Sequence, residues 1–387
     1  MEPKTAARAR FDAVRAQLIA LSHRIHAHPE VGFEEERAST WLAETLADAG
    51  FVVTRGICDL PTAFVAHAGS GPLHLAICAE YDCLPGIGHA CGHNIIAAMA
   101  AGAGIAVAEV ADEVGVTVHV IGTPAEEMGG GGKILLLQRG AFAGMHAAMM
   151  AHPSPTDNVT PVTLANSYFE VRYTGKEAHA AAFPERGINA ADALTIAQVA
   201  LGLLRQHIRA TDRIHGIVTK GGDAPNIIPA HTAARYAVRA QTLDDLEEIR
   251  TKVLRCFEAG ALATGATLDI VGQRQPYAQL RHDPDIAAAY RRNAEALGRV
   301  FPAPSAPVRP GGSTDMGNVS LALPSIHPMI GINSLPATNH QPEFAAHCIT
   351  EAADQALVHG AMAMAWTAID IATTATIRNR LLGIMSS

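Results

Sequence analysis

Short apolar segments alternate with helical segments in the first part of the chain, and this alternation restricts the fold more than any other feature. Short length and apolar composition predict buried strands at 63–66, 73–79, 117–121 and 147–151. A helical pattern over 95–110, rich in alanine and glycine, separates the second strand from the third. Its small side chains would allow the helix to lie close to a sheet. Such alternation is typical of an α/β fold, in which ligands bind beyond the strand ends.

The segment from 166 to 280 follows a different pattern and is predicted to be an inserted domain. Its strands and helices are expected, in chain order, at 168–173 (strand), 188–209 (helix), 214–219 (strand), 232–240 (strand), 243–264 (helix) and 267–272 (strand). This β-α-β-β-α-β order is that of a ferredoxin-like α+β domain. Residues 1–165 and 281–387 would then form one discontinuous α/β domain, with a central β-sheet flanked by helices. Further helices of that domain are predicted at 11–27, 34–49, 285–297 and 349–372.

The composition is that of a soluble globular protein. Of the 387 residues, 49% are hydrophobic and 17% are charged. The formal net charge of -8 gives no general attraction to nucleic acids or anionic membranes, so neither is an expected partner. The charged N-terminus lacks the apolar core of a signal peptide, and we therefore expect a cytoplasmic protein. Six cysteines are too few and too irregularly spaced for a disulfide framework.

The stretch G-H-A-C-G-H-N, residues 88–94, places Cys91 and His93 two positions apart, just before the alanine-rich helix. Asn94 is the expected N-cap of that helix. A helix N-terminus lowers the pKa of a thiol, and the thiolate is the form that binds metal. The alternative is a buried thiol beside a capping histidine, and the stretch alone leaves both interpretations open. Its spacing is too short for a structural zinc finger.

A second candidate site is G-T-P-A-E-E-M-G-G-G-G-K, which directly follows a predicted strand. The adjacent carboxylates of Glu126 and Glu127 repel each other unless a cation neutralises one of them. Adjacent acids are also common on solvated surfaces, but the strand end and the four glycines favour a site that a ligand approaches closely. The stretch is not a phosphate-binding P-loop, because Lys133 is followed by Ile134 instead of Ser or Thr.

Two single histidines complete the pattern. His152 is at the end of another predicted strand, and His340 lies in a loop before the last helix. Either one alone is more often a structural residue than a ligand. Together with Cys91, His93 and Glu127, however, they form a set of thiolate, imidazole and carboxylate groups that suits Zn²⁺ or Mn²⁺. Five protein ligands exceed what one tetrahedral ion needs, so the set favours two ions.

Motifs spread over nearly the whole chain resemble those of the M20 metallopeptidases. They include H-R-I-H-A-H-P-E-V-G-F-E-E, A-E-Y-D-C-L-P-G-I-G-H-A-C-G-H-N, G-T-P-A-E-E, A-H-P, G-K-E-A-H-A-A, A-P-N-I-I-P, G-G-S-T-D-M-G-N and N-H-Q-P-E-F. Within the family, the chain is most similar to the amidohydrolase branch that includes p-aminobenzoyl-glutamate hydrolase and peptidase M20 domain-containing protein 2.

The resemblance implies a catalytic domain of the metal-dependent exopeptidase type with a dinuclear metal centre, interrupted by a ferredoxin-like lid that also forms a homodimer. The positions that match the metal ligands are Cys91, His93, Glu127, His152 and His340. Glu126 matches the general base. His179 and Asn226 match residues that contact substrate, and His179 often does so across a dimer. Asn226, with backbone around Gly312 and Ser313, would hold the carboxylate end of the substrate.

The chain departs from the wider family at two places. Glu80-Tyr81-Asp82 stands where classical members have H-x-D, so Asp82 is expected at most to orient a ligand. Asn94 replaces the aspartate usual in auxin-conjugate and hippurate hydrolases, which favours the p-aminobenzoyl-glutamate and dipeptidase side of the branch.

The expected activity is hydrolysis of an amide bond to an amino acid or small peptide with a free carboxylate. A p-aminobenzoyl-glutamate-like compound, a dipeptide and an N-acyl amino acid all fit. One alternative is a catalytically silent scaffold of the same fold, although the complete set of ligand and base positions argues against it. Another is a thiol hydrolase that uses Cys91 with His89 or His93, but it leaves the glutamate pair and both distant histidines unexplained.

Overall fold

The computed structural model describes residues 1–301 and 312–383. The chain divides into two compact units, Met1–Val162 with Leu280–Ser387, and Thr163–Gln279. Each unit has its own hydrophobic core.

The first unit is built around a six-stranded mixed sheet. In spatial order its strands are β1 (Val52–Arg55), β2 (Phe64–Ala68), β4 (Val116–Gly122), β3 (Leu73–Ala79), β5 (Ala147–Met149) and β11 (Ser325–Ile326). β3 runs parallel to β4 and β5, and β11 runs parallel to β5, whereas β2 is antiparallel to both β1 and β4. Nearly every side chain of β3 is buried, because helices cover both faces of the sheet there.

Helix α3 (His93–Ala108) is the centre of this core. It packs on β3 and β4 on one side and against α1 (Pro3–His26) and α11 (Glu351–Thr373) on the other. A Cβ at Gly102 would lie 2.7 Å from the ring of Phe11, and one at Gly104 would overlap Val120 of β4. The predicted close approach of an alanine- and glycine-rich helix to the sheet is therefore confirmed.

The remaining helices complete both faces of the first unit. They are α2 (Glu36–Asp48), α4 (Ala111–Val114), α5 (Gly132–Gln138), α8 (Pro284–Ala296), α9 (Met316–Ala322), α10 (Pro342–His347) and α12 (Ala375–Leu381). Apolar side chains of α5 and α9 cover the sheet face opposite α3. Among the described helices, α11 alone has the length and apolar composition of a candidate membrane span, and 78% of its most apolar stretch is buried inside the structure.

A parallel pair of short strands, β6 (His152–Ser154) and β12 (Met329–Gly331), lies in the same unit. The pair brings a segment that precedes the second unit beside one that follows it. His152 N donates to Pro328 O at 2.9 Å, and this bond helps to fix the backbone of a predicted site residue.

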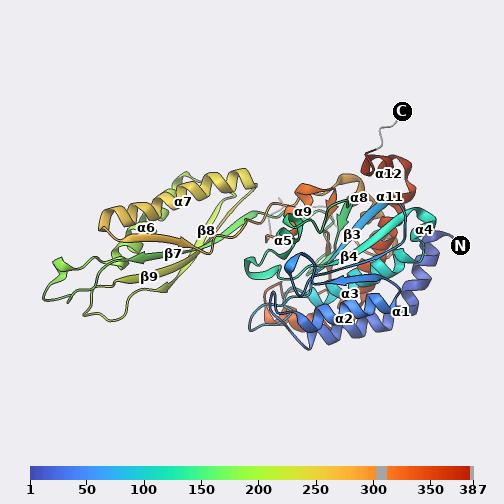
Figure 1. The fold of residues 1–387 in the computed structure, drawn as a ribbon, viewed down its shortest axis with the longest axis horizontal. Coiled ribbons are helices and arrows are strands. Elements are labelled where there is room, and N and C mark those ends of the chain that lie inside the picture. Colours follow the sequence, from blue (N-terminus) through green and yellow to red (C-terminus); the bar gives the residue numbers. More distant parts are fainter. Residues whose placement is uncertain (302–311, 384–387) are drawn as a thin grey trace. The chain divides into compact units, whose positions relative to one another are not determined.

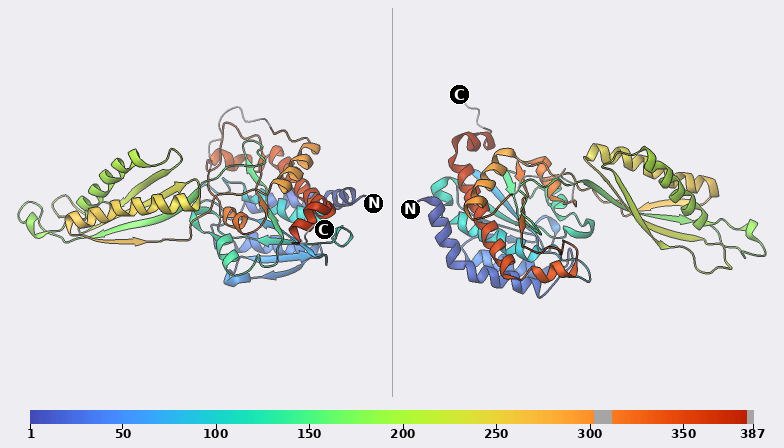
Figure 2. Two further views of the ribbon diagram at one scale, coloured as in Figure 1. Left: turned by 90° about the horizontal axis from the view of Figure 1, so that it is seen from above. Right: turned by 180° about the vertical axis from the view of Figure 1, so that it is seen from behind.

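The second unit is a four-stranded antiparallel sheet with two helices. The strand order is β10 (Thr267–Val271), β7 (Ala165–Thr174), β9 (His231–Ala240) and β8 (Arg213–Lys220). Helices α6 (Ala190–Leu204) and α7 (Leu243–Thr264) lie side by side over one face of this sheet (Figure 1 and Figure 2). The chain order is β-α-β-β-α-β, as the ferredoxin-like prediction requires.

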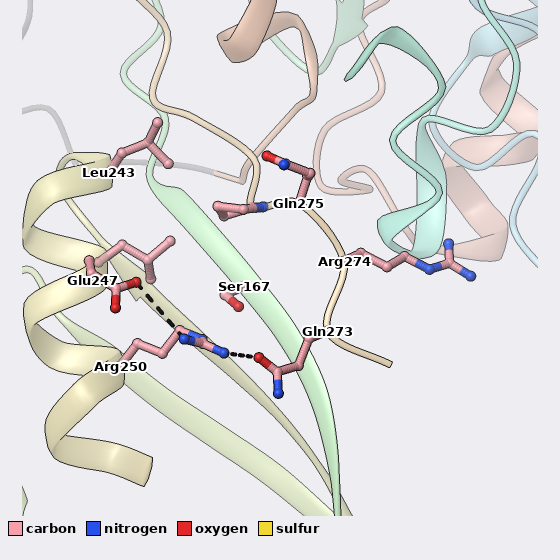
Figure 3. A pocket seen from close by; sticks show the side chains of 9 residues that line it. Ser167, Leu243, Glu247, Arg250, Gln273, Arg274 and Gln275 are labelled. Atoms are coloured by element: carbon pink, nitrogen blue, oxygen red, sulfur yellow. Dashed lines mark hydrogen bonds and ion pairs between the residues drawn. The ribbon is translucent and has the colours of Figure 1, made fainter. Parts of the chain in front are cut away.

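One end of the second unit contains an open hollow of about 340 Å³. Its polar lining includes Arg250, which lies 3.9 Å from Glu247 and donates a hydrogen bond to Gln273 (Figure 3). Because the guanidinium is held by neighbours within the unit, we assign no ligand to this hollow.

Candidate metal centre

Three loops with predicted site residues begin at one edge of the six-stranded sheet. Because β3 is parallel to β4 and β5, the carboxyl ends of these strands lie side by side. Glu80 directly follows β3, and His152 comes shortly after β5. Glu126 and Glu127 follow β4, the latter at the start of a short 3-10 turn. The topology therefore gathers residues that are distant in the sequence.

The structure brings all the predicted metal ligands and the predicted base into one cluster. It contains three overlapping groups, whose ligand atoms lie within 4.8 Å of one another: Cys91 with His93 and His152, Cys91 with Glu127 and His340, and His93 with Glu126 and Glu127. Cys91 Sγ is 3.6 Å from His152 Nε2, and His340 Nε2 is 3.6 Å from Glu127 Oε1. This donor set matches Zn²⁺ or Mn²⁺ chemistry.

The surroundings of His93 fit a bound cation. Its ring is fully buried, and Nδ1 lies 3.0 Å from Asp82 Oδ1. Nε2 faces Glu80 Oε2 at 3.3 Å and Glu127 Oε1 at 3.9 Å. Nε2 and both of these oxygens are buried without a hydrogen bond among the described residues. An imidazole nitrogen and two carboxylate oxygens that converge in this way are typical of a metal site, with Asp82 fixing the ring from behind.

Two expectations about the G-H-A-C-G-H-N stretch are wrong. Asn94 is not the N-cap of α3: Gly92, at φ 79°, is the cap, and Asn94 Nδ2 instead donates to Ser22 Oγ at 2.9 Å. The helix N-terminus does not lower the pKa of the Cys91 thiol either. Burial, and then the charge of Glu127, raise that pKa, so the thiolate requires a neighbouring cation. This environment does not suit a free thiol nucleophile.

Glu126 is buried beside other acids. Burial, followed by the charges of Glu80 and Glu127, raises its pKa well above the ordinary value. A carboxyl group in such surroundings accepts a proton more readily than one in water, which is the property required of a general base that later acts as an acid.

A buried ion network next to the cluster was missed by the sequence reasoning. Lys133 is fully buried at the start of α5, and its Nζ lies 2.5 Å from Glu80 Oε1 and 2.6 Å from Asp315 Oδ1. Lys133 N also donates to Asp315 Oδ2 at 2.9 Å. Glu80, Glu126 and Asp315 place carboxylate oxygens within 4.8 Å of one another. One sequence feature pointed to this network. Lys133 is directly followed by the apolar run I-L-L-L, where a solvated lysine is unusual.

The remaining predicted residues lie in two places. Gly312 and Ser313 precede Asp315 in the first unit, and Gly312 is exposed with φ 39°. His179 and Asn226 come together in the second unit, where Ala180 N donates to Asn226 O at 3.0 Å. His179 Nδ1 accepts from the Ala182 N–H at 3.1 Å, so the ring proton is on Nε2. His179 can therefore donate a hydrogen bond from Nε2.

Comparisons with known proteins agree with this geometry. Residues 76–364 match the model of peptidase family M20/M25/M40. The chain is 39% identical to the Xaa-Arg dipeptidase of Mus musculus over 383 residues, covering 95% of this chain and 88% of the relative. It is 34% identical to a p-aminobenzoyl-glutamate hydrolase polypeptide of Escherichia coli over 280 residues, covering 67% of this chain and 58% of the relative.

Solved structures share the fold. A putative aminohydrolase from methicillin-resistant Staphylococcus aureus superimposes with a TM-score of 0.77 at 19% identity, covering 95% of this chain and 99% of that one. A dinuclear metal-binding peptidase of the M20 family from Bacillus subtilis gives 0.63 at 22% identity, covering 91% and 98%. The chain therefore belongs to peptidase family M20/M25/M40, as a metal-dependent amidohydrolase or dipeptidase.

Proposed function

We propose that this enzyme hydrolyses dipeptides with a basic C-terminal residue, using two Zn²⁺ or Mn²⁺ ions. The ions would be held by Cys91, His93, Glu127, His152 and His340. The observation that carries the metal assignment is the convergence of buried atoms that have no hydrogen bond to any residue the structure describes, above all His93 Nε2 and Glu127 Oε1. The substrate class rests on the similarity to the Xaa-Arg dipeptidase over 95% of the chain.

The protein's own groups have separate tasks in this reaction. Bound divalent ions lower the pKa of a water molecule and polarise the scissile carbonyl. Glu126 takes the proton of the attacking water and delivers it to the leaving amine. By the family resemblance, His179 would donate from Nε2–H to the oxygen that becomes negatively charged in the transition state, and loss of one such donor costs roughly 3 kcal/mol. Asn226 would bind the substrate carboxylate, as would the backbone at Gly312 and Ser313.

A release assay with three amide classes tests the proposal. The panel contains dipeptides ending in arginine or lysine, p-aminobenzoyl-glutamate and N-acyl amino acids, each with enzyme reconstituted with Zn²⁺ or Mn²⁺. The basic dipeptides should give the highest kcat/KM, and EDTA should abolish activity until metal is added back. Turnover that survives EDTA would instead indicate a thiol hydrolase. A metal-loaded protein that is inert towards all three classes would favour a scaffold.

We also propose that the protein is a cytoplasmic homodimer formed through the second unit. Strand β8 is one of the two edges of its sheet, and Ile217 and Val218 on this strand are 65% and 46% exposed. An exposed edge strand with apolar side chains can pair with a second copy.

The six free cysteines are consistent with a reducing compartment.

Light scattering after size-exclusion chromatography tests the dimer. The unaltered protein should have twice the mass of the chain, and Ile217→Lys combined with Val218→Pro should give a monomer. Leu262→Lys is a matched control, since Leu262 is 88% exposed on α7, away from the β8 edge, and this variant should stay dimeric. An unaltered protein that runs as a monomer contradicts the proposal.

A further inference from the structure

The stretch H-P-E-V-G-F-E-E, residues 28–35, contributes no residue to the candidate metal centre. It lies between α1 and α2, and its last residue, Glu35, is at the N-cap position of α2. The Glu35 side chain is fully buried and makes no capping hydrogen bond to that helix. Because buried polar groups are nearly always hydrogen-bonded, its partners must lie elsewhere in the fold.

Both carboxyl oxygens of Glu35 bind other parts of the first unit. Oε1 accepts from the Ala125 N–H at 2.8 Å, and Oε2 accepts from the Thr62 hydroxyl at 2.9 Å. Thr62 and Ala125 are also buried. Thr62 is fixed in turn, because the Tyr81 hydroxyl donates to Thr62 O at 2.5 Å. The Ala125 N–H is therefore bound to a carboxyl group whose position is well defined.

Ala125 directly precedes the proposed base, Glu126, and its backbone is in an unusual conformation. Its φ is 53°, in the left-handed region that residues other than glycine seldom adopt. Such a conformation persists only where the surroundings hold it. Gly32 of the same stretch packs closely there, since a Cβ at Gly32 would lie 2.8 Å from Ala125 Cβ. The stretch thus holds Ala125 by a hydrogen bond and by close packing.

The residue on the other side of Glu126 is held in a similar way. Glu127 N donates to Asp82 Oδ2 at 2.9 Å, and the other oxygen of Asp82 contacts the His93 ring. Two buried carboxyl groups thus bind the backbone N–H groups on either side of the proposed base. Because Asp82 holds Glu127 independently, the Glu35 bond fixes the backbone at Glu126 without being needed for the proposed ligand.

We propose that Glu35 is a positioning residue for amide hydrolysis: it fixes the Ala125 backbone and thereby aims the Glu126 carboxylate at the attacking water. This role rests on the proposed function, in which Glu126 is the base. A displacement of a reacting group by about 1 Å can lower a rate about 10²-fold. Loss of the Glu35 bond should therefore reduce turnover, whereas substrate binding depends on other groups.

Steady-state kinetics and metal analysis of Glu35 variants test the proposal. Glu35→Met keeps the approximate length of the side chain and removes both acceptors. It should lower kcat about 10- to 100-fold, with KM changed less than about threefold and an unchanged metal content. Glu35→Gln should recover most of kcat, because its amide oxygen can accept from Ala125 N–H and its amide nitrogen can donate to the Thr62 hydroxyl.

A gentler variant keeps the test valid if Glu35→Met does not fold. Thr62→Val retains the Glu35 carboxyl group and removes the hydroxyl that fixes Oε2, so kcat should fall by a smaller factor than in Glu35→Met. Thr117→Val is the matched control. Its buried hydroxyl donates to Gly71 O at 2.7 Å near the start of β4, at the opposite end of this strand from the Glu126 loop. This control should keep its kcat, and equal kcat in the two threonine variants would overturn the proposal.

A double variant separates this role from the proposed function. In Glu126→Gln protein, the addition of Glu35→Met should change kcat less than about twofold, because two residues that act through one group are not additive. An equally large effect in that background would overturn the proposal, as would unchanged kcat or lost metal in Glu35→Met, or no recovery in Glu35→Gln. Turnover retained by Glu126→Gln alone would instead contradict the proposed function itself.

Discussion

Replacing Glu126 by glutamine should lower kcat about 10²- to 10⁴-fold, the usual contribution of a positioned general acid or base. The substitution keeps the size of the side chain and removes its ability to take a proton from water. Since Glu126 is not a proposed ligand, the metal content should be unchanged. The measurements are steady-state kinetics on the best basic dipeptide and metal analysis of the same preparation.

The neighbouring residue supplies the control. Glu127→Gln removes a proposed ligand whose Oε1 lies 3.6 Å from His340 Nε2, so this variant should lose metal affinity as well as activity. The two adjacent variants thus separate proton transfer from metal binding. If Glu126→Gln retained substantial turnover, the assignment of Glu126 as the base would be wrong.

Replacing Lys133 by methionine should lower the free energy of unfolding by about 3–5 kcal/mol, the usual cost of removing one partner of a buried ion pair. The substitution leaves Glu80 and Asp315 without their ammonium partner, in a place where water does not reach. Urea unfolding followed by circular dichroism measures the change. Adding Asp315→Asn to Lys133→Met should recover part of the loss, because one unpaired charge is removed.

A surface pair of similar length shows that burial decides this effect. Lys252 Nζ lies 2.7 Å from Glu248 Oε1 on one face of α7, and both side chains are exposed. Lys252→Met should cost far less than Lys133→Met, because an exposed helix pair contributes little to stability. A Lys133→Met variant that lost no more than Lys252→Met would contradict the structural role of the buried network.

Local patterns were sufficient to predict the main elements of both units. Buried strands such as β3 and the alanine-rich α3 follow from apolar runs and small residues, because both elements are covered on all sides. The predicted ends of the helices and strands were less accurate. α1 begins at Pro3, not at Phe11, since Pro3 is in the first turn and the Glu2 carboxylate accepts from Thr5 N at 3.1 Å. The short β6 and β12 have little signal of their own, since each depends on pairing with the other.

The residues of the candidate site could be predicted where their side chains are of types that bind metal or transfer protons. Cys91 and the predicted histidines and glutamates stand out in the sequence, and the topology brings the six of them that belong to the first unit together. The contact between Lys133 and Asp315 joins residues 182 positions apart, and no local sequence pattern indicates it. The pKa of Cys91 was mispredicted for a related reason: it depends on burial and on Glu127, which only the folded structure places nearby.

The late position of the His340 loop in the sequence determines when the proposed ligands can come together during synthesis. His340 N donates to Ala90 O at 2.8 Å, so the last predicted ligand in the sequence rests on the loop that holds Cys91. A ribosome that has finished the second unit has already made the other four predicted ligands, but not this one or the long helix α11 that packs on α3. Domains generally fold as units during translation. A nascent chain therefore cannot bring the five proposed ligands together until His340 has emerged.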